Sequence, residues 1–148
     1  MSTDETTTSD LIETLKNGEE GFKKAADKLS EDSRADLSAE FVAFSQQRAR
    51  FSAELASIAH AYGDDIAQRS TVPGALHRGW MSVTDALTGS SPEAVLKAAL
   101  TGEDHAVTEY EEAMKADISE ELRVILSRQF SEVRATRDRV KALTTDFR

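Results

Sequence analysis

The sequence predicts an all-α protein, built as a four-helix bundle with a long crossover in its middle. Apolar residues recur at helical spacing over four long stretches of the 148-residue chain. Both prolines, Pro73 and Pro92, fall in the middle third, which leaves the outer thirds free to form long helices. The turns within the first and the last helix pair are short, whereas about thirty residues separate the two pairs, enough to cross the length of a bundle.

Residues 1–9 are polar and rich in threonine, and we expect them to form a flexible N-terminal tail. Asp10 and Glu13 then fit a capping box, in which a side-chain oxygen accepts hydrogen bonds from the free N–H groups of the first turn. This pair predicts that the first helix covers about residues 10–29.

The second helix is predicted over about residues 33–62, with Ser33 and Asp36 as a further capping pair. The short turn before it indicates that it returns antiparallel to the first helix. In the crossover, an amphipathic stretch predicts a short extra helix over about residues 73–88. Trp80 lies on the apolar stripe of this helix and is expected to anchor it to the bundle.

The third helix is predicted over about residues 92–115, because Ser91 suits its N-cap and Pro92 its first position. A tight turn leads to the fourth helix, over about residues 119–146. Two antiparallel hairpins joined by a long crossover are the ferritin-like variant of the four-helix bundle. The bundle domain therefore covers residues 10–148.

The composition excludes several classes of site and partner. The chain contains no cysteine, so disulfides, thiolate ligands and cysteine nucleophiles are excluded. A net charge of −9 argues against nucleic acid and anionic membranes as partners. No apolar run approaches the ~20 residues of a membrane span. The N-terminus also has neither the basic nor the apolar region of a secretion signal. We therefore expect a cytoplasmic protein.

A set of short motifs, in order along the chain, resembles the bacterial ferritin-like family known as domain of unknown function 2383. The motifs are Asn17-Gly18-Glu19-Glu20-Gly21-Phe22 with Ala25-Ala26, then Arg48, Phe51, Glu54 and Leu55, then Gly74-Ala75-Leu76-His77-Arg78-Gly79-Trp80, then Gly102-Glu103-Asp104 with Tyr110, and finally Gln129 with Asp138-Arg139-Val140. The resemblance implies a ferritin-like bundle and a stress-linked role, and no established activity. The family usually has histidine where this chain has Arg137.

A di-metal centre is one interpretation of the glutamates in the predicted helices. Ferritin-like di-iron sites use one glutamate from each of two helices and a Glu-x-x-His pair from each of the other two. In this chain Ser57 and Ala135 occupy the positions where the histidines are required. The alternative function is therefore an iron- or manganese-binding redox or storage protein that uses waters in place of histidine. Its candidate ligands are Glu19, Glu54, Glu103 and Glu132.

A buried polar network is the other interpretation, and the one we favour. Helical periodicity places Glu103 in the middle of the apolar stripe of the third helix and Arg48 on that of the second. Gln129 faces inward as well, with Glu19 and Arg137 nearer the edges. Since an unpaired buried charge is too costly to persist, we predict a buried Arg48–Glu103 ion pair whose hydrogen bonds Gln129 completes.

The predicted ion pair favours a non-catalytic structural or interaction protein, with no catalytic residue and no cofactor. A guanidinium fixed in the core would repel a metal dication at the same place. Because ferritin-like bundles often self-associate, we expect a homodimer.

Overall fold

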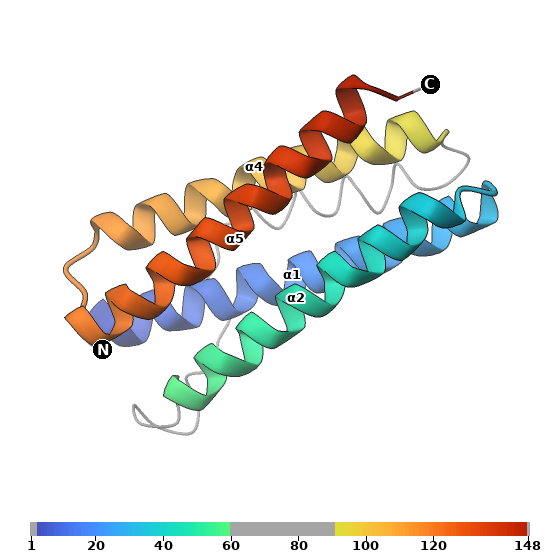
Figure 1. The fold of residues 1–148 in the computed structure, drawn as a ribbon. Coiled ribbons are helices and arrows are strands. Elements are labelled where there is room, and N and C mark those ends of the chain that lie inside the picture. The colour runs from blue at the N-terminus through green and yellow to red at the C-terminus, as the bar shows by residue number, and fades with distance from the viewer. Residues whose placement is uncertain (1–2, 60–90, 148) are drawn as a thin grey trace.

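The computed structural model describes residues 3–59 and 91–147, and this part of the chain folds into four α-helices. Figure 1 shows them as two helical hairpins packed against each other. No strand occurs among the described residues, in agreement with the predicted all-α helical bundle. The helices are α1 (Thr3–Glu31), α2 (Ala35–Ala59), α4 (Pro92–Lys115) and α5 (Glu120–Thr145).

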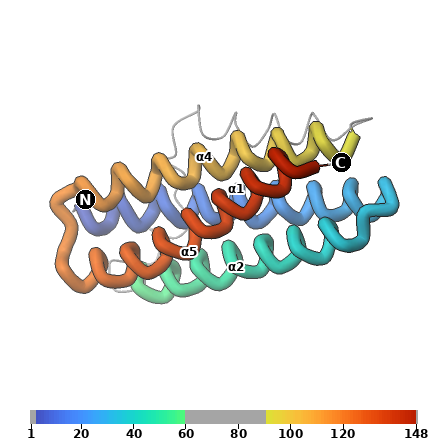
Figure 2. The backbone as a smooth tube through the Cα atoms, turned by 45° about the horizontal axis from the view of Figure 1, so that its top comes forward, coloured from blue at the N-terminus to red at the C-terminus, as the bar shows by residue number. Residues whose placement is uncertain are grey.

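Each helix runs antiparallel to its two neighbours, in the order α1, α2, α5, α4 around the bundle (Figures 1 and 2). The backbones of α1 and α2 pack most closely, followed by the α4–α5 and α1–α4 pairs. The end of α2 and the start of α4 lie at opposite ends of the bundle. The crossover helix predicted over 73–88 lies outside the described residues. In the part that the structure describes, no helix is both long enough and apolar enough to cross a bilayer.

The first helix begins earlier than predicted, at Thr3 instead of Asp10. The segment expected to be a flexible tail is therefore helical from Thr3, and Thr8 and Ser9 are fully buried. Asp10 lies inside the helix, so its predicted capping box does not form. The start of α1 is held from outside, because the Ser119 backbone N–H donates a hydrogen bond to Asp4 Oδ1 at 2.8 Å. This tertiary contact outweighs the low helix propensity of a threonine-rich segment.

The turn between α1 and α2 differs from the predicted capping pair. Ser33 adopts a left-handed backbone conformation with φ of 63°. The Arg34 N–H donates to the Leu29 carbonyl at 2.9 Å, a bond that closes the end of α1. Ser33 is thus the residue that ends α1 and not the N-cap of α2. Asp36 pairs with Arg34 through two hydrogen bonds of 3.2 Å.

Side-chain N-caps begin both helices of the second hairpin. Ser91 Oγ accepts a hydrogen bond from the Ala94 N–H at 3.2 Å, and Pro92 occupies the first turn of α4, as the sequence predicts. Ser119 Oγ accepts from the Leu122 N–H at 3.3 Å at the start of α5. The two hydroxyls satisfy backbone donors that the helices themselves leave free.

The apolar core is divided into two clusters along the bundle. The tyrosine cluster lies at the end where α1 begins, and the phenylalanine cluster at the end where α1 finishes. The tyrosine cluster consists of Leu11, Ile12, Leu15, Phe51, Leu55, Ala59, Ala106, Val107, Tyr110, Ala113, Ile118, Leu122, Leu126 and Val133. The phenylalanine cluster consists of Phe22, Ala25, Ala26, Leu29, Leu37, Phe41, Val95, Leu96, Ala99 and Val140.

Every helix carries a small or polar residue at the level between the two clusters. These residues form a polar layer across the middle of the bundle. They are Gly18 on α1, Arg48 on α2, Glu103 on α4 and Thr136 on α5, and all four are buried. The fold therefore places charged groups at its centre, with an apolar cluster on each side.

Candidate functional site

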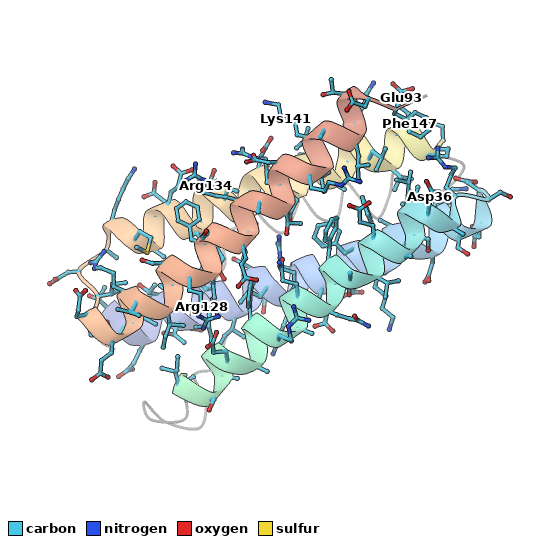
Figure 3. The ribbon with its side chains drawn as sticks, in the orientation of Figure 1. Asp36, Glu93, Arg128, Arg134, Lys141 and Phe147 are labelled. Carbon is cyan, nitrogen blue, oxygen red and sulfur yellow. The ribbon has the colours of Figure 1, made fainter. Side chains whose placement is uncertain are left out.

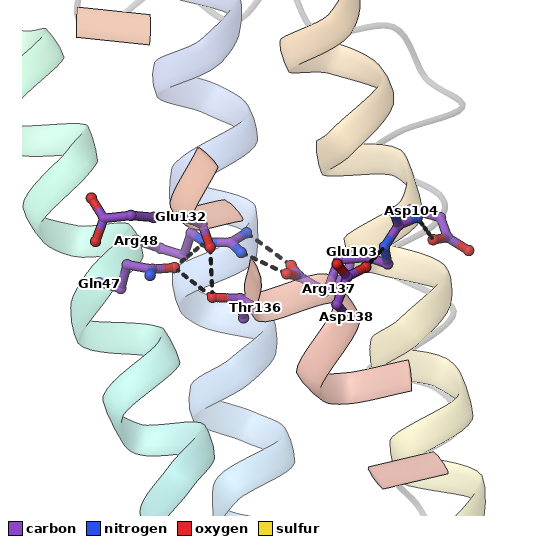
Figure 4. A network of polar contacts seen from close by, with 8 residues as sticks. All are labelled: Gln47, Arg48, Glu103, Asp104, Glu132, Thr136, Arg137 and Asp138. Carbon is purple, nitrogen blue, oxygen red and sulfur yellow. Dashed lines mark hydrogen bonds and ion pairs between the residues drawn. The ribbon is translucent and has the colours of Figure 1, made fainter. Parts of the chain in front are cut away.

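A bidentate ion pair occupies the polar layer. Arg48 Nη1 donates to Glu103 Oε1 at 2.8 Å, and Arg48 Nη2 donates to Glu103 Oε2 at 2.6 Å. The exposed fractions of the two side chains are 1% and 0%. Figure 4 shows Arg48 reaching from α2 toward Glu103 on α4, diagonally across the bundle. Two parallel charge-assisted bonds fix the orientation of both groups as well as attracting them.

Gln47 and Phe22 complete the surroundings of the guanidinium. The third guanidinium nitrogen, Arg48 Nε, donates to Gln47 Oε1 at 3.2 Å, and Thr136 Oγ1 donates to the same oxygen at 3.2 Å. The guanidinium carbon lies 5.4 Å from the centroid of the Phe22 ring, within cation–π range. Each nitrogen of Arg48 thus has an acceptor, and the guanidinium lies against a ring that belongs to the phenylalanine cluster.

Gly18 gives the guanidinium room against α1. A Cβ atom added at Gly18 would lie 3.4 Å from Arg48 Nη1 and 3.5 Å from Arg48 Cγ. These distances are ordinary van der Waals contacts for a methyl group and leave no space for a longer side chain. Gly18 lies inside α1, so no turn requires a glycine there. The small residue instead leaves room for the Arg48 side chain.

Substitutions at Gly18 are expected to separate helix propensity from packing against Arg48. Gly18→Ala should raise the free energy of unfolding by about 0.5–1 kcal/mol, because alanine is the better helix former and its methyl group fits. Gly18→Leu should lower it by about 1–3 kcal/mol, because the longer side chain displaces the guanidinium. Urea titrations of the two variants measure both effects. Destabilisation by alanine as large as that by leucine would contradict this packing.

Two effects act in opposite directions on the pKa of the Glu103 carboxyl. Burial raises the pKa of the Glu103 carboxyl, and the charge and hydrogen bonds of Arg48 act to lower it. The neighbouring charges of Asp104 and Arg137 make smaller contributions of opposite sign. The closed core therefore carries a desolvation cost that Arg48 must offset.

Gln129 is buried as predicted, but it does not complete the ion pair. The Tyr110 hydroxyl donates to Gln129 Oε1 at 2.8 Å, and Gln129 Nε2 donates to Glu54 Oε1 at 2.7 Å. Arg128 donates to the other Glu54 oxygen, and that hydrogen bond holds the pKa of the Glu54 carboxyl below its usual range. Gln129 thus belongs to a second polar chain, which runs from the buried Tyr110 to the surface.

The other two residues assigned to the network lie at its margins. Glu19 is half-buried, and its backbone carbonyl accepts a hydrogen bond from Ser45 Oγ at 2.9 Å. Arg137 pairs with Asp104 at 3.3 Å and with Asp138 at 2.8 Å, on the partly exposed side of the layer (Figure 4). The prediction that both join the buried network was wrong, because each lies at the edge of its apolar stripe, where a long side chain reaches solvent. The sequence analysis did not identify Gln47 as part of the network, because this half-buried residue also lies at the edge of its apolar stripe.

The four glutamates of the metal interpretation are dispersed. Glu103 is held by Arg48 and Glu54 by Arg128, whereas Glu132 is exposed. Across residues 3–59 and 91–147, no group of three or more histidine or carboxylate side chains is arranged to hold a metal ion.

An acidic pocket lies between the start of α1 and the end of α4. It has a volume of about 120 Å³ and is lined by Asp10, Glu109 and Glu112 among others. Burial raises the pKa of the Asp10 carboxyl, and burial followed by the nearby charges of Asp10 and Glu112 raises that of Glu109. A carboxyl whose pKa is raised by folding stabilises the folded state only at low pH, and loses this contribution as pH rises through the folded pKa.

The variant Glu109→Gln is therefore expected to stabilise the protein at pH 7. It should also remove the contribution by which Glu109 raises the unfolding free energy as pH falls toward about 5. Urea titrations at several pH values measure both. Glu93→Gln, which changes an exposed glutamate of α4 away from the pocket, is the control. A stability loss at pH 7 for Glu109→Gln would contradict the sign of the pKa shift.

Comparison with known proteins gives one family. The family model described as Domain of unknown function (DUF2383) matches residues 5–116, which include Arg48 and Glu103. No curated protein and no solved structure gives a significant match to the chain.

Proposed function

The chain belongs to the DUF2383 family, and we propose that it is a non-catalytic ferritin-like bundle that acts through its surfaces. In this proposal a buried Arg–Glu ion pair stands where related bundles hold two metal ions. The observation that supports it is the bidentate contact of Arg48 with Glu103, at 2.8 and 2.6 Å in the middle of the core.

Charge neutrality supports the proposal. A di-metal centre in a bundle core needs about four carboxylates to balance its cations. In this protein the one fully buried glutamate among the candidates, Glu103, is already balanced by Arg48. The guanidinium also presents a fixed positive charge to any cation that approaches Glu103, and a low dielectric strengthens that repulsion.

The same proposal includes self-association. A bundle without chemistry in its core acts by what it binds, and a second copy of the chain is the partner that the ferritin-like architecture favours. Size-exclusion chromatography with light scattering tests this point, with a dimer expected. A monomer at high micromolar concentration would remove the homodimer and leave the core assignment untouched.

Metal analysis of protein purified without chelator tests the function. We expect no stoichiometric iron or manganese, also after incubation with either ion and removal of the excess. About two equivalents per chain would instead establish the di-metal function. Glu103→Gln separates the two accounts further, because it would abolish metal uptake by a di-metal site. If the core holds the Arg48–Glu103 ion pair and no metal, Glu103→Gln changes only the free energy of unfolding.

A further inference from the structure

Each pair of neighbouring helices meets along a line that we call a seam. Along the α2–α5 seam the two backbones come close at fewer positions than along the other three seams. We propose that this seam opens in the native protein, with the α1–α4 seam as the hinge, and that ionic strength controls how often it opens. The opening gives water and small ions access to the polar layer. This inference is independent of the proposed function, because it concerns the way the two hairpins separate.

Side chains bridge α2 and α5 at three levels, spaced seven residues apart on α2. Glu40 pairs with Arg139 at the first level. Gln47 accepts from Thr136 at the second. At the third, Glu54 pairs with Arg128 and also accepts a hydrogen bond from Gln129. Both ion pairs are solvent-exposed, and Figure 3 shows Arg128 on the side of α5 that faces α2. Exposed ion pairs contribute little and are weakened by salt, because counterions screen them.

The α1–α2 seam is closed by two short hydrogen bonds from side chains to backbone carbonyls, whereas the bond of this kind from Gln129 Nε2 on α5 to the Phe51 carbonyl on α2 is 3.5 Å long. Ser38 Oγ donates to the Ala26 carbonyl at 2.7 Å, and Ser45 Oγ donates to the Glu19 carbonyl at 2.9 Å. The α1–α2, α4–α5 and α1–α4 backbones approach each other at many positions, whereas the α2 and α5 backbones do so at few. The weakest backbone packing is therefore between α2 and α5, opposite the α1–α4 hinge.

The ion pair beneath the seam lowers the cost of opening. Arg48 on α2 and Glu103 on α4 belong to different hairpins, so separation of the hairpins exposes both groups to water. Hydration returns the solvation free energy that burial takes from the two charges, which offsets part of the lost attraction. An apolar layer at the same place would gain nothing from contact with water.

A single cysteine placed in the seam measures its opening, because the chain has no cysteine of its own. Thr136 is 5% exposed at the middle bridge, and Ser45 is 8% exposed in the α1–α2 seam. Thr136→Cys and Ser45→Cys are therefore a matched pair. Their labelling by iodoacetamide, an uncharged reagent, is followed in the folded protein at about 20 mM and about 500 mM salt.

We expect Thr136→Cys to be labelled at least about tenfold faster than Ser45→Cys at low salt. High salt should increase the rate at Thr136→Cys about threefold to tenfold and leave Ser45→Cys unchanged. Adding Glu40→Gln and Glu54→Gln should reproduce the high-salt rate at low salt, whereas adding Asp104→Asn, which breaks an α4–α5 pair, should not. Equal rates at the two cysteines, or a salt response shared by both, would show that only global unfolding exposes the seam and would overturn the proposal.

Discussion

Replacing Arg48 by methionine is expected to lower the free energy of unfolding by about 3–5 kcal/mol. The variant keeps an unbranched side chain that fills part of the same space, and it removes the charge that compensates Glu103, whose carboxyl has no contact with solvent. Urea titration measures the loss. Arg139→Met, which breaks the exposed pair with Glu40, is the matched control and should cost less than about 1 kcal/mol. Equal losses for the two variants would contradict the burial of the Arg48–Glu103 pair.

The pH dependence of Arg48→Met gives this prediction a second readout. Without Arg48, only burial and weaker neighbours act on Glu103, so the pKa of its carboxyl in the folded protein rises further above the unfolded value. A raised folded pKa stabilises the protein at low pH and loses that effect as pH rises. The deficit of the variant should therefore shrink as pH falls from 7 toward about 5. A deficit that is constant over this range would indicate that only packing was lost.

Replacing Gln129 by methionine is expected to lower the free energy of unfolding by about 1–3 kcal/mol. The change leaves the Tyr110 hydroxyl, which is fully buried, without its acceptor at 2.8 Å. Glu54 keeps Arg128 as a partner, so the penalty is concentrated on Tyr110.

The double variant Gln129→Met with Tyr110→Phe tests the cause of that loss. Removal of the hydroxyl removes the unsatisfied donor, so the double variant should recover most of the stability lost in Gln129→Met. Urea titrations of the wild type, both single variants and the double variant give the comparison. If Tyr110→Phe adds its own loss to that of Gln129→Met, the hydrogen bond does not account for the effect.

The helix faces could be predicted from the sequence because apolar residues mark them repeatedly. Glu103 lies between Ala99 and Ala106 on the apolar stripe of α4, so any orientation of α4 that buries the stripe also buries Glu103. The same periodicity placed Arg48 inside. Charge neutrality then left little choice of partner, since two opposite buried charges at one level of a bundle must meet.

The partners of Gln129 could not be predicted in the same way. Periodicity gives the face of a residue but not the register of one helix against another. Glu103 and Tyr110 lie on the same face of α4, about two turns apart, so a shift of two turns exchanges one for the other as the neighbour. The start of α1 at Thr3 could not be predicted from local sequence for a related reason. The first turn of α1 contacts Ser119, which is distant in sequence, and the residues after it are buried in the bundle.

The coupling free energy between Arg48 and Glu103 tests the central claim most directly. It is measured by urea titration of the wild type, Arg48→Met, Glu103→Leu and the variant that carries both changes. The buried ion pair predicts that the double variant is nearly as stable as the wild type, with a coupling of about 3 kcal/mol or more. Single losses that add to within about 0.5 kcal/mol would show that the two side chains do not meet in the core.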